Sequence, residues 1–155
     1  MEPENYKYRG AQVLVALHDA QLREFLGVWR QFEALGLELP ASTSPDYASR
    51  EALLAHVLGA AARYLIWMCE KLDLPRPELD ERPDPARLPA GADRYLEDVL
   101  AAWQWPLRGV TEEQADNQAF TSRWGIPYSI DAMLEHAVMH PLRHAYQLRG
   151  LMAGG

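Results

Sequence analysis

Three of the chain's five histidines lie in one short segment, Glu135–Gln147, with the sequence EHAVMHPLRHAYQ. His140 and His144 are four residues apart, so on a helix their imidazoles stand on the same face and can hold one metal ion between them. Neutral imidazole is a ligand for zinc, nickel, iron and manganese. His136 falls on the flank of that face, where we expect a surface position or a supporting role beside the site.

The same spacing also has ordinary explanations. HxxxH pairs arise by chance in unrelated helices, and a single inward histidine usually forms one hydrogen bond within a core. Pro141 lies between the two histidines, lacks the amide that would bond the Ala137 carbonyl, and costs a helix about 3 kcal/mol. The helix either kinks there beside a shaped cavity or simply bends around the core.

The helix that carries this pair is the last of four that the hydrophobic periodicity predicts. Ser49 and Ser129 are the predicted N-caps of the second and fourth helices, and Gly150 is the predicted stop of the fourth. Apolar residues recur at helical spacing in four segments: about residues 10–35, 50–72, 92–107 and 130–150.

Two connections between these helices are informative. Residues 73–91 carry five prolines and many charges, which predicts a stiff, solvated connection that crosses over along a bundle. Residues 117–129 contain aromatic residues and Gly125, which favour a short two-stranded excursion around a turn. Four amphipathic helices without a strong strand signal predict an all-α fold, a four-helix bundle with a long crossover between the second and third helices.

Length and charge limit the class of protein. The 155 residues are enough for one sizeable core, so we treat residues 1–155 as a single domain. A net charge of −7 and a pI near 5.2 argue against a nucleic acid or an anionic membrane as partner, since either would require a clustered basic face.

The chain is predicted to be a soluble cytoplasmic protein. Cys69 is the only cysteine, so no intramolecular disulfide can form, and we expect a buried, inert thiol in a reducing compartment. The N-terminus, MEPENYKYRG, lacks the basic start and apolar core of a secretory signal. The most apolar run, LLAHVLGAAARYLIWMC, is interrupted by His56 and Arg63 within the roughly 20 residues that a membrane span needs.

A third histidine, His56, lies at the edge of the inward face of the predicted second helix. Helix bundles build interior metal sites from side chains on facing helices. One imidazole from the second helix and two from the fourth would meet this pattern, with His140 and His144 as the pair.

With these parts in this order, nearly the whole chain resembles the DinB/YfiT-like proteins, which are four-helix bundles that hold a metal ion with three histidines. The segment SREALLAHVLGAAARYL resembles the family's second helix and places its histidine at His56. An H-x3-H-x2-Q pattern in the fourth helix falls on His140, His144 and Gln147. The segment FTSRWGIPYS looks like the family's short connection before the last helix.

The resemblance implies a divalent ion held by His56, His140 and His144, with zinc or nickel first and iron or manganese as alternatives. Three protein ligands leave a coordination position open, which is typical of catalytic sites. The family contains thiol-dependent S-transferases and a maleylpyruvate isomerase, and many members are assigned as hydrolases without a demonstrated reaction, so the resemblance implies a metal-dependent hydrolase or thiol transferase. The resemblance also implies a small-molecule substrate, a low-molecular-weight thiol as a candidate co-substrate, and pairing of the chain as a homodimer. Ala145 and Tyr146 stand where family sequences often have Arg-Gly, and neither is a proposed ligand.

Other polar residues are candidates for the surroundings of the site. His18 and Gln21 share the inward side of the first helix and could face the pocket, although His18 could instead be a core histidine bonded to a backbone carbonyl. Arg63 and Arg143 lie on helix flanks and could bind an anionic group of a substrate, or could be solvated or paired with acidic residues. Gln147 is placed to orient a ligand.

The alternative is a non-catalytic bundle that uses a metal for structure, sensing or regulation. In that case a protein carboxylate would close the fourth coordination position. Trp29, Trp103 and Tyr146 would then be candidates for a surface that binds a partner.

Overall fold

The computed structural model describes residues 5–154, and residues 1–4 and 155 lie outside it. Residues 1–4 belong to the N-terminal segment that the sequence analysis expects not to be a secretory signal, and this expectation remains a prediction. Among the described residues the fold is all-α, as predicted. Its elements are α1 (Arg9–Ala34), the 3-10 helix η2 (Pro45–Tyr47), α2 (Arg50–Lys71), α3 (Leu88–Trp103), the 3-10 helix η3 (Pro106–Gly109), α4 (Glu112–Asp116) and α5 (Ile130–Gly154).

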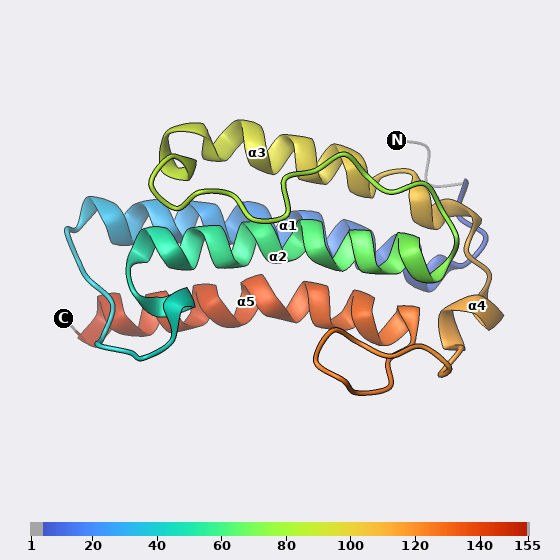
Figure 1. Cartoon of the computed structure of the whole chain (residues 1–155). Helices are drawn as coiled ribbons and strands as arrows, with labels where there is room; N and C mark the ends of the chain where they lie inside the picture. The colour runs from blue at the N-terminus through green and yellow to red at the C-terminus, as the bar shows by residue number, and fades with distance from the viewer. Residues whose placement is uncertain (1–4, 155) are drawn as a thin grey trace.

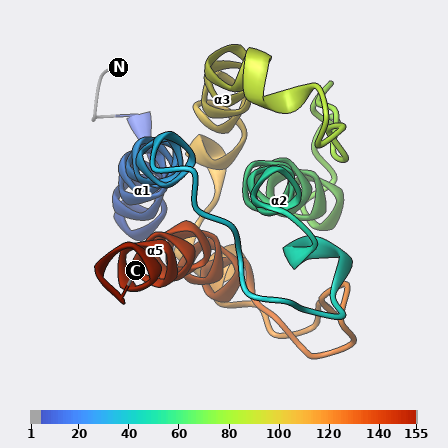
Figure 2. The same cartoon turned by 90° about the vertical axis from the view of Figure 1, so that its left-hand side faces the viewer.

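The four long helices pack as a bundle. α1 and α5 run in one direction along it, and α2 and α3 run in the other (Figure 1). Viewed along the axis, α2 lies between α3 and α5, and α1 lies beside α5 (Figure 2). Because α2 and α3 point the same way, residues 72–87 between them return along the bundle (Figure 1). The predicted long crossover is thus confirmed.

Side-chain caps determine where α2 and α5 begin. Ser49 Oγ accepts a hydrogen bond from the Ala52 amide at 3.0 Å. Ser129 Oγ accepts one from the Ala132 amide, also at 3.0 Å. Each bond satisfies an amide that a helix start would otherwise leave unpaired. Both predicted N-caps are confirmed, and they set which residues of α2 and α5 face the interior.

Two helix ends differ from the prediction. α3 has an extra turn from Leu88, where Pro89 is tolerated, and a kink at Gly91 (φ −115°, ψ 17°) separates this turn from the regular helix that starts at Ala92, close to the predicted position. α5 continues through Gly150, so the predicted stop there is wrong. A glycine inside a helix costs only about 1 kcal/mol, which packing of the rest of the helix can offset.

The connection before α5 forms one antiparallel bridge instead of the two strands expected. Thr121 pairs with Pro127, and the Tyr128 amide donates to the Phe120 carbonyl at 3.0 Å. Gly125 makes the turn with φ of 82°, as its position predicts. A single bridge has too few hydrogen bonds to be a strand pair, so it serves only to close this loop.

Trp29 and Trp103, considered above for a partner surface, are core residues with 1% of each side chain exposed. The Trp29 indole donates to the Arg50 carbonyl at 2.7 Å, and the Trp103 indole donates to the Ala61 carbonyl at 3.0 Å. Both rings therefore join α2 to a neighbouring helix, and the partner-surface interpretation is wrong for them. Tyr146, the third residue of that set, is 77% exposed.

α2 is the central core helix. Its length and composition would allow it to cross a membrane, but 78% of its most apolar window is buried inside the bundle. Cys69 near its end is fully buried, and burial raises the pKa of its thiol to about 11. The expected inert thiol is confirmed, because a protonated, enclosed sulfur is a poor nucleophile.

His18 of α1 is enclosed in the bundle without a polar partner. It is 1% exposed, and its ring lies against Trp103 with centroids 3.9 Å apart. Neither ring nitrogen has a hydrogen-bond partner among the described residues, so the expected bond to a backbone carbonyl is not formed. Desolvation lowers the pKa of His18 to about 3, which keeps the imidazole neutral at neutral pH.

We predict that His18→Leu makes the fold more stable and less sensitive to acid. Between the unfolded pKa of 6.5 and the folded pKa of about 3, the unfolded chain binds the extra proton, so the free energy of unfolding falls as the pH falls. At about pH 5 this group should cost the wild type about 2 kcal/mol relative to neutral pH. Urea unfolding of both proteins at the two pH values measures the difference, and an equal pH dependence would contradict the assignment.

Candidate metal centre

His56 of α2 meets His140 and His144 of α5 in the interior of the bundle. One ring nitrogen from each of the three lies within 4.8 Å of the others. The closest approach is 3.0 Å, between His140 Nε2 and His56 Nε2. His140 and His144 are buried and His56 is partly buried, so the cluster is largely shielded from solvent.

Local helix geometry explains this meeting. His140 and His144 are one turn apart on α5, with ring centroids 4.8 Å apart. His56 lies nearly two turns into α2, counted from the cap at Ser49. Because α2 packs against α5, the face of α2 that holds His56 is directed at the histidine pair. Pro141 is buried beside them, and α5 remains helical through it.

The outer nitrogens of two of these rings have oxygen partners. His56 Nδ1 lies 3.3 Å from a carboxylate oxygen of Asp46. His144 Nδ1 lies 2.8 Å from the Gln147 side-chain oxygen. An oxygen acceptor calls for a proton on Nδ1, so each ring keeps the Nε2 lone pair for the centre of the cluster. Outer partners of this kind commonly orient metal-binding histidines.

This arrangement leaves lone pairs that no protein group satisfies. His144 Nε2 is buried without a hydrogen-bond partner among residues 5–154. His140 Nδ1 also has no partner among these residues, and His140 Nε2 lies 3.0 Å from His56 Nε2, a contact that is a hydrogen bond only while one of the two nitrogens carries a proton. Zinc–nitrogen bonds of about 2.0–2.1 Å place tetrahedral ligands about 3.4 Å apart, so small ring rotations would let these nitrogens share one ion. The donor set therefore fits a divalent metal ion.

The protonation states also suit metal binding. Desolvation is the main cause that lowers the pKa of His140 to about 2 and that of His144 to about 4. Burial lowers the pKa of His56 as well, although Asp46 acts in the opposite direction. All three imidazoles are thus neutral at neutral pH and need not lose a proton before coordinating a cation.

Asp46 and Tyr47 are parts of the site that the sequence analysis missed. Both lie in η2, within the connection between α1 and α2. The Tyr47 ring centroid is 6.1 Å from that of His56 and 5.9 Å from that of His144. The available signal was the Pro-Asp-Tyr turn just before the Ser49 cap, but no periodicity connects a turn to a histidine on another helix.

A pocket of about 330 Å³ opens beside the cluster, and we call it the histidine pocket. His136, Arg63 and Arg143 all line it, as the sequence analysis allowed. The His136 ring is stacked with His140, with an interplanar angle of 17°. The lining residues are Tyr47, His56, Ala60, Arg63, Tyr64, Trp67, Arg123, Trp124, Met133, His136, His140 and Arg143.

Three of the candidate residues do not line the histidine pocket. His18 lies against Trp103 instead, on the side of the bundle where α1 and α3 pack. Gln21 is partly buried on α1 and has no hydrogen bond from its side chain among those found in residues 5–154. Gln147 is not part of that lining either, but it contacts the cluster directly through His144 Nδ1.

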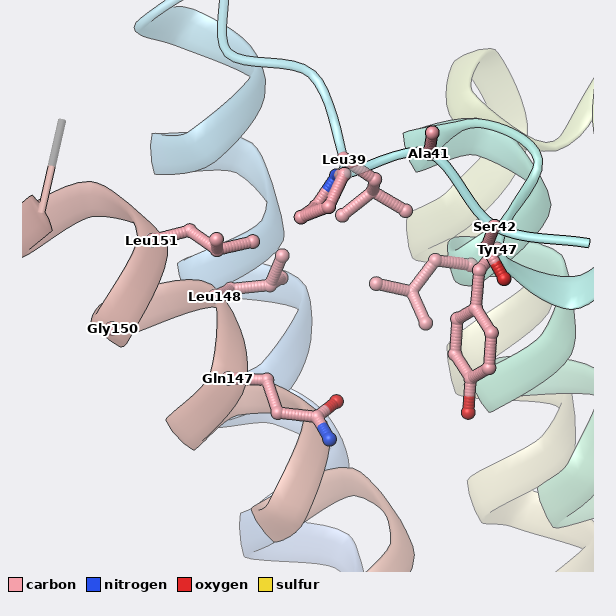
Figure 3. Close-up of a pocket in the computed structure, with 10 residues that line it drawn as sticks. Leu39, Ala41, Ser42, Tyr47, Gln147, Leu148, Gly150 and Leu151 are labelled. Carbon is pink, nitrogen blue, oxygen red and sulfur yellow. The ribbon is translucent and has the colours of Figure 1, made fainter.

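A second pocket of about 490 Å³ adjoins the site on the other side of Tyr47, and we call it the apolar groove. Figure 3 shows Leu148 and Leu151 of α5 across from the loop that carries Leu39, with Tyr47 facing Gln147. No charged side chain lines it. Its residues are Leu39, Pro40, Ala41, Ser42, Tyr47, Leu53, Gln147, Leu148, Gly150 and Leu151.

We predict that the chain binds one zinc or nickel ion and that His140→Ala weakens this binding by at least about 100-fold, because it removes a ligand. His18→Leu is the matched control, since it removes a buried histidine outside the cluster. Elemental analysis and competition with a coloured chelator measure stoichiometry and affinity. Equal metal binding by His140→Ala and wild type would exclude this cluster as the site.

Loss of the Asp46 carboxylate should weaken binding of the metal ion, although Asp46 is not itself a ligand. We expect Asp46→Ala to lower metal affinity by about 10–100-fold, the usual effect of losing an outer partner of a ligating histidine. Asp98→Ala is the control, because Asp98 is an exposed residue of α3 that pairs only with Arg94. Competition with the same chelator measures the metal affinity. An unchanged metal affinity of Asp46→Ala would show that the carboxylate does not contribute to metal binding through His56.

Comparisons with known proteins add no assignment to this geometry. No protein-family model matches the chain, and no curated protein or solved structure matches it either. The conclusion at this point is therefore structural: the chain is a helical protein with a three-histidine cluster that could hold a metal ion.

Proposed function

We propose that this chain is a DinB/YfiT-like, divalent-metal-dependent enzyme that acts as a hydrolase or as a transferase of a low-molecular-weight thiol. The observation that carries the proposal is the convergence of His56, His140 and His144, all neutral, with buried nitrogens of His140 and His144 that no group among the described residues satisfies. The three-histidine ligand set of the resembling family supports the same assignment.

The composition of the cluster favours catalysis over a closed structural site. Three imidazoles form it, and no carboxylate belongs to it among the described residues. The nearest acidic group, Asp46, lies at His56 Nδ1 on the outer side of that ring. Three protein ligands leave at least one position for water or substrate, and the histidine pocket gives access to it.

Imidazole ligands suit zinc and nickel best, and iron or manganese are the further candidates. When bound, such an ion would supply Lewis-acid chemistry, lowering the pKa of a bound water or thiol. Because the three imidazole ligands carry no negative charge, they would not offset the charge of the ion that lowers the pKa of the bound water or thiol. The choice between hydrolysis and thiol transfer then depends on what enters the pocket.

Side chains of the pocket provide groups for proton handling. Burial raises the pKa of Tyr64 to about 12, so its hydroxyl stays protonated and can donate. Burial lowers the pKa of His136, so its ring stays neutral and can accept a proton. The rings of Tyr64 and His136 have centroids 5.3 Å apart and both line the pocket next to His140. These two residues are our candidates for the acid and base.

The proposal also includes a cytoplasmic homodimer with no nucleic-acid or membrane partner. The net charge of −7 supports the exclusion of nucleic acid. Exposed apolar side chains on the adjacent helices α1 and α5 support pairing of two chains: Val13, Leu17, Met139 and Tyr146.

Activity assays on zinc- and nickel-loaded protein test the proposed function. Thiol transfer is followed as glutathione or cysteine consumed with chlorodinitrobenzene, and hydrolysis as release of nitrophenol from nitrophenyl acetate. We expect one of the two reactions to exceed that of loaded His140→Ala by about 100-fold or more, the scale of a single well-placed catalytic group. If stoichiometric metal is bound and neither reaction depends on His140, the non-catalytic alternative replaces the enzyme.

A further inference from the structure

The histidine pocket is cationic in an acidic protein. Three arginines line it, Arg63, Arg123 and Arg143, and no carboxylate is among its lining residues. The chain as a whole carries a net charge of −7, so this concentration of positive charge is opposite to the overall balance. The three histidines beside the pocket are neutral, so the positive charge of the pocket comes from the arginines alone.

Two of these arginines are held by the protein. Arg63 donates to the Glu81 carbonyl at 2.6 Å and to the His56 carbonyl at 3.4 Å, so it braces the crossover against α2. Arg123 lies 3.5 Å from a Glu81 carboxylate oxygen. That carboxylate also pairs with Arg76, so it is shared between two cations.

Arg143 is the cation that the protein leaves available. It forms no hydrogen bond and no ion pair among residues 5–154, and its side chain is exposed at the pocket. It follows His140 by one turn of α5 and precedes His144 directly. It lines the histidine pocket together with His140 and His136.

Flat aromatic walls stand beside this charge. The Trp124 ring lies 5.0 Å from His136 at an interplanar angle of 33°. The Tyr64 ring stands edge-on to His136, with centroids 5.3 Å apart at 87°. These rings pack against one another and all three line the histidine pocket, so they present aromatic surface on which a planar group can stack.

We propose that the histidine pocket binds a small planar carboxylate, an aromatic or conjugated acid whose carboxylate pairs with Arg143 and whose plane packs against Trp124 and His136. Guanidinium recognises carboxylates through paired hydrogen bonds, which explains an arginine without an internal partner at this position. The inference deepens the proposed function by naming its substrate class. It concerns binding alone, so it can be tested with and without metal.

Benzoate and benzamide form a matched pair of probes, since they share size and ring and differ in charge. We expect metal-free wild type to bind benzoate about tenfold more tightly than benzamide, the difference that one charge-assisted contact makes. Arg143→Gln should remove this preference by weakening benzoate alone. Calorimetric titration measures affinity, and shifts of the Trp124 indole signal in NMR spectra report the location.

Two control variants separate the pocket from its surroundings. Arg149→Gln removes another exposed arginine of α5, one that pairs with Glu24, and should bind benzoate as wild type does. Leu151→Ala alters the apolar groove (Figure 3) and should also leave benzoate binding unchanged. Equal binding of benzoate and benzamide, equal effects of Arg143→Gln and Arg149→Gln, or a loss confined to Leu151→Ala would each overturn the proposal.

The binding experiment and the test of metal-dependent activity can fail separately. Benzoate selectivity that depends on Arg143 in protein that takes up no metal would uphold this inference and reject the metal-dependent function. Stoichiometric metal uptake without any charge preference would do the reverse.

Discussion

The structure depends on the removal of three imidazoles from water at the contact between α2 and α5. Desolvation keeps His140 and His144 neutral far below neutral pH. Burial also deprives their nitrogens of the water that would satisfy them. A buried polar atom without a partner costs free energy that the folded state retains until something satisfies it. A cation accepted by several lone pairs at once would meet this need, so packing alone produces a three-histidine cluster that could hold a metal ion.

The polarity around the cluster is arranged in shells with different tasks. Asp46 and Gln147 contact the outer nitrogens of His56 and His144 and so determine which nitrogen is presented inward. The arginines stand farther out, at the pocket. Neutral ligands would leave an ion its full charge, and the cations beside it add to the same positive potential. With an ion bound, a site built this way would favour anionic ligands and would lower the pKa of a nearby thiol or water.

Much of the fold could be predicted because its signals are local. Ser49 and Ser129 act as caps through bonds to amides three residues on, and helical periodicity follows from the sequence spacing. The predictions were wrong where a local preference was weak and the packing of the helices outweighed it. Gly150 was expected to end α5, but glycine only disfavours a helix, and neighbouring contacts decide. The five-residue helix α4 was too short to show any periodicity.

The sequence by itself determined the pair His140 and His144, because a spacing of four residues on a helix brings two side chains together whatever the rest of the chain does. Helical periodicity alone did not distinguish His18 from His56, since both are single histidines at the inward side of an amphipathic helix, and the choice of His56 depended on the family resemblance. The tertiary structure brings His56 to the pair by packing α2 against α5, and it encloses His18 against Trp103. The positions of Asp46 and Tyr47 about the cluster were likewise decided there, because contacts between distant segments depend on how helices pack and not on spacing along the chain.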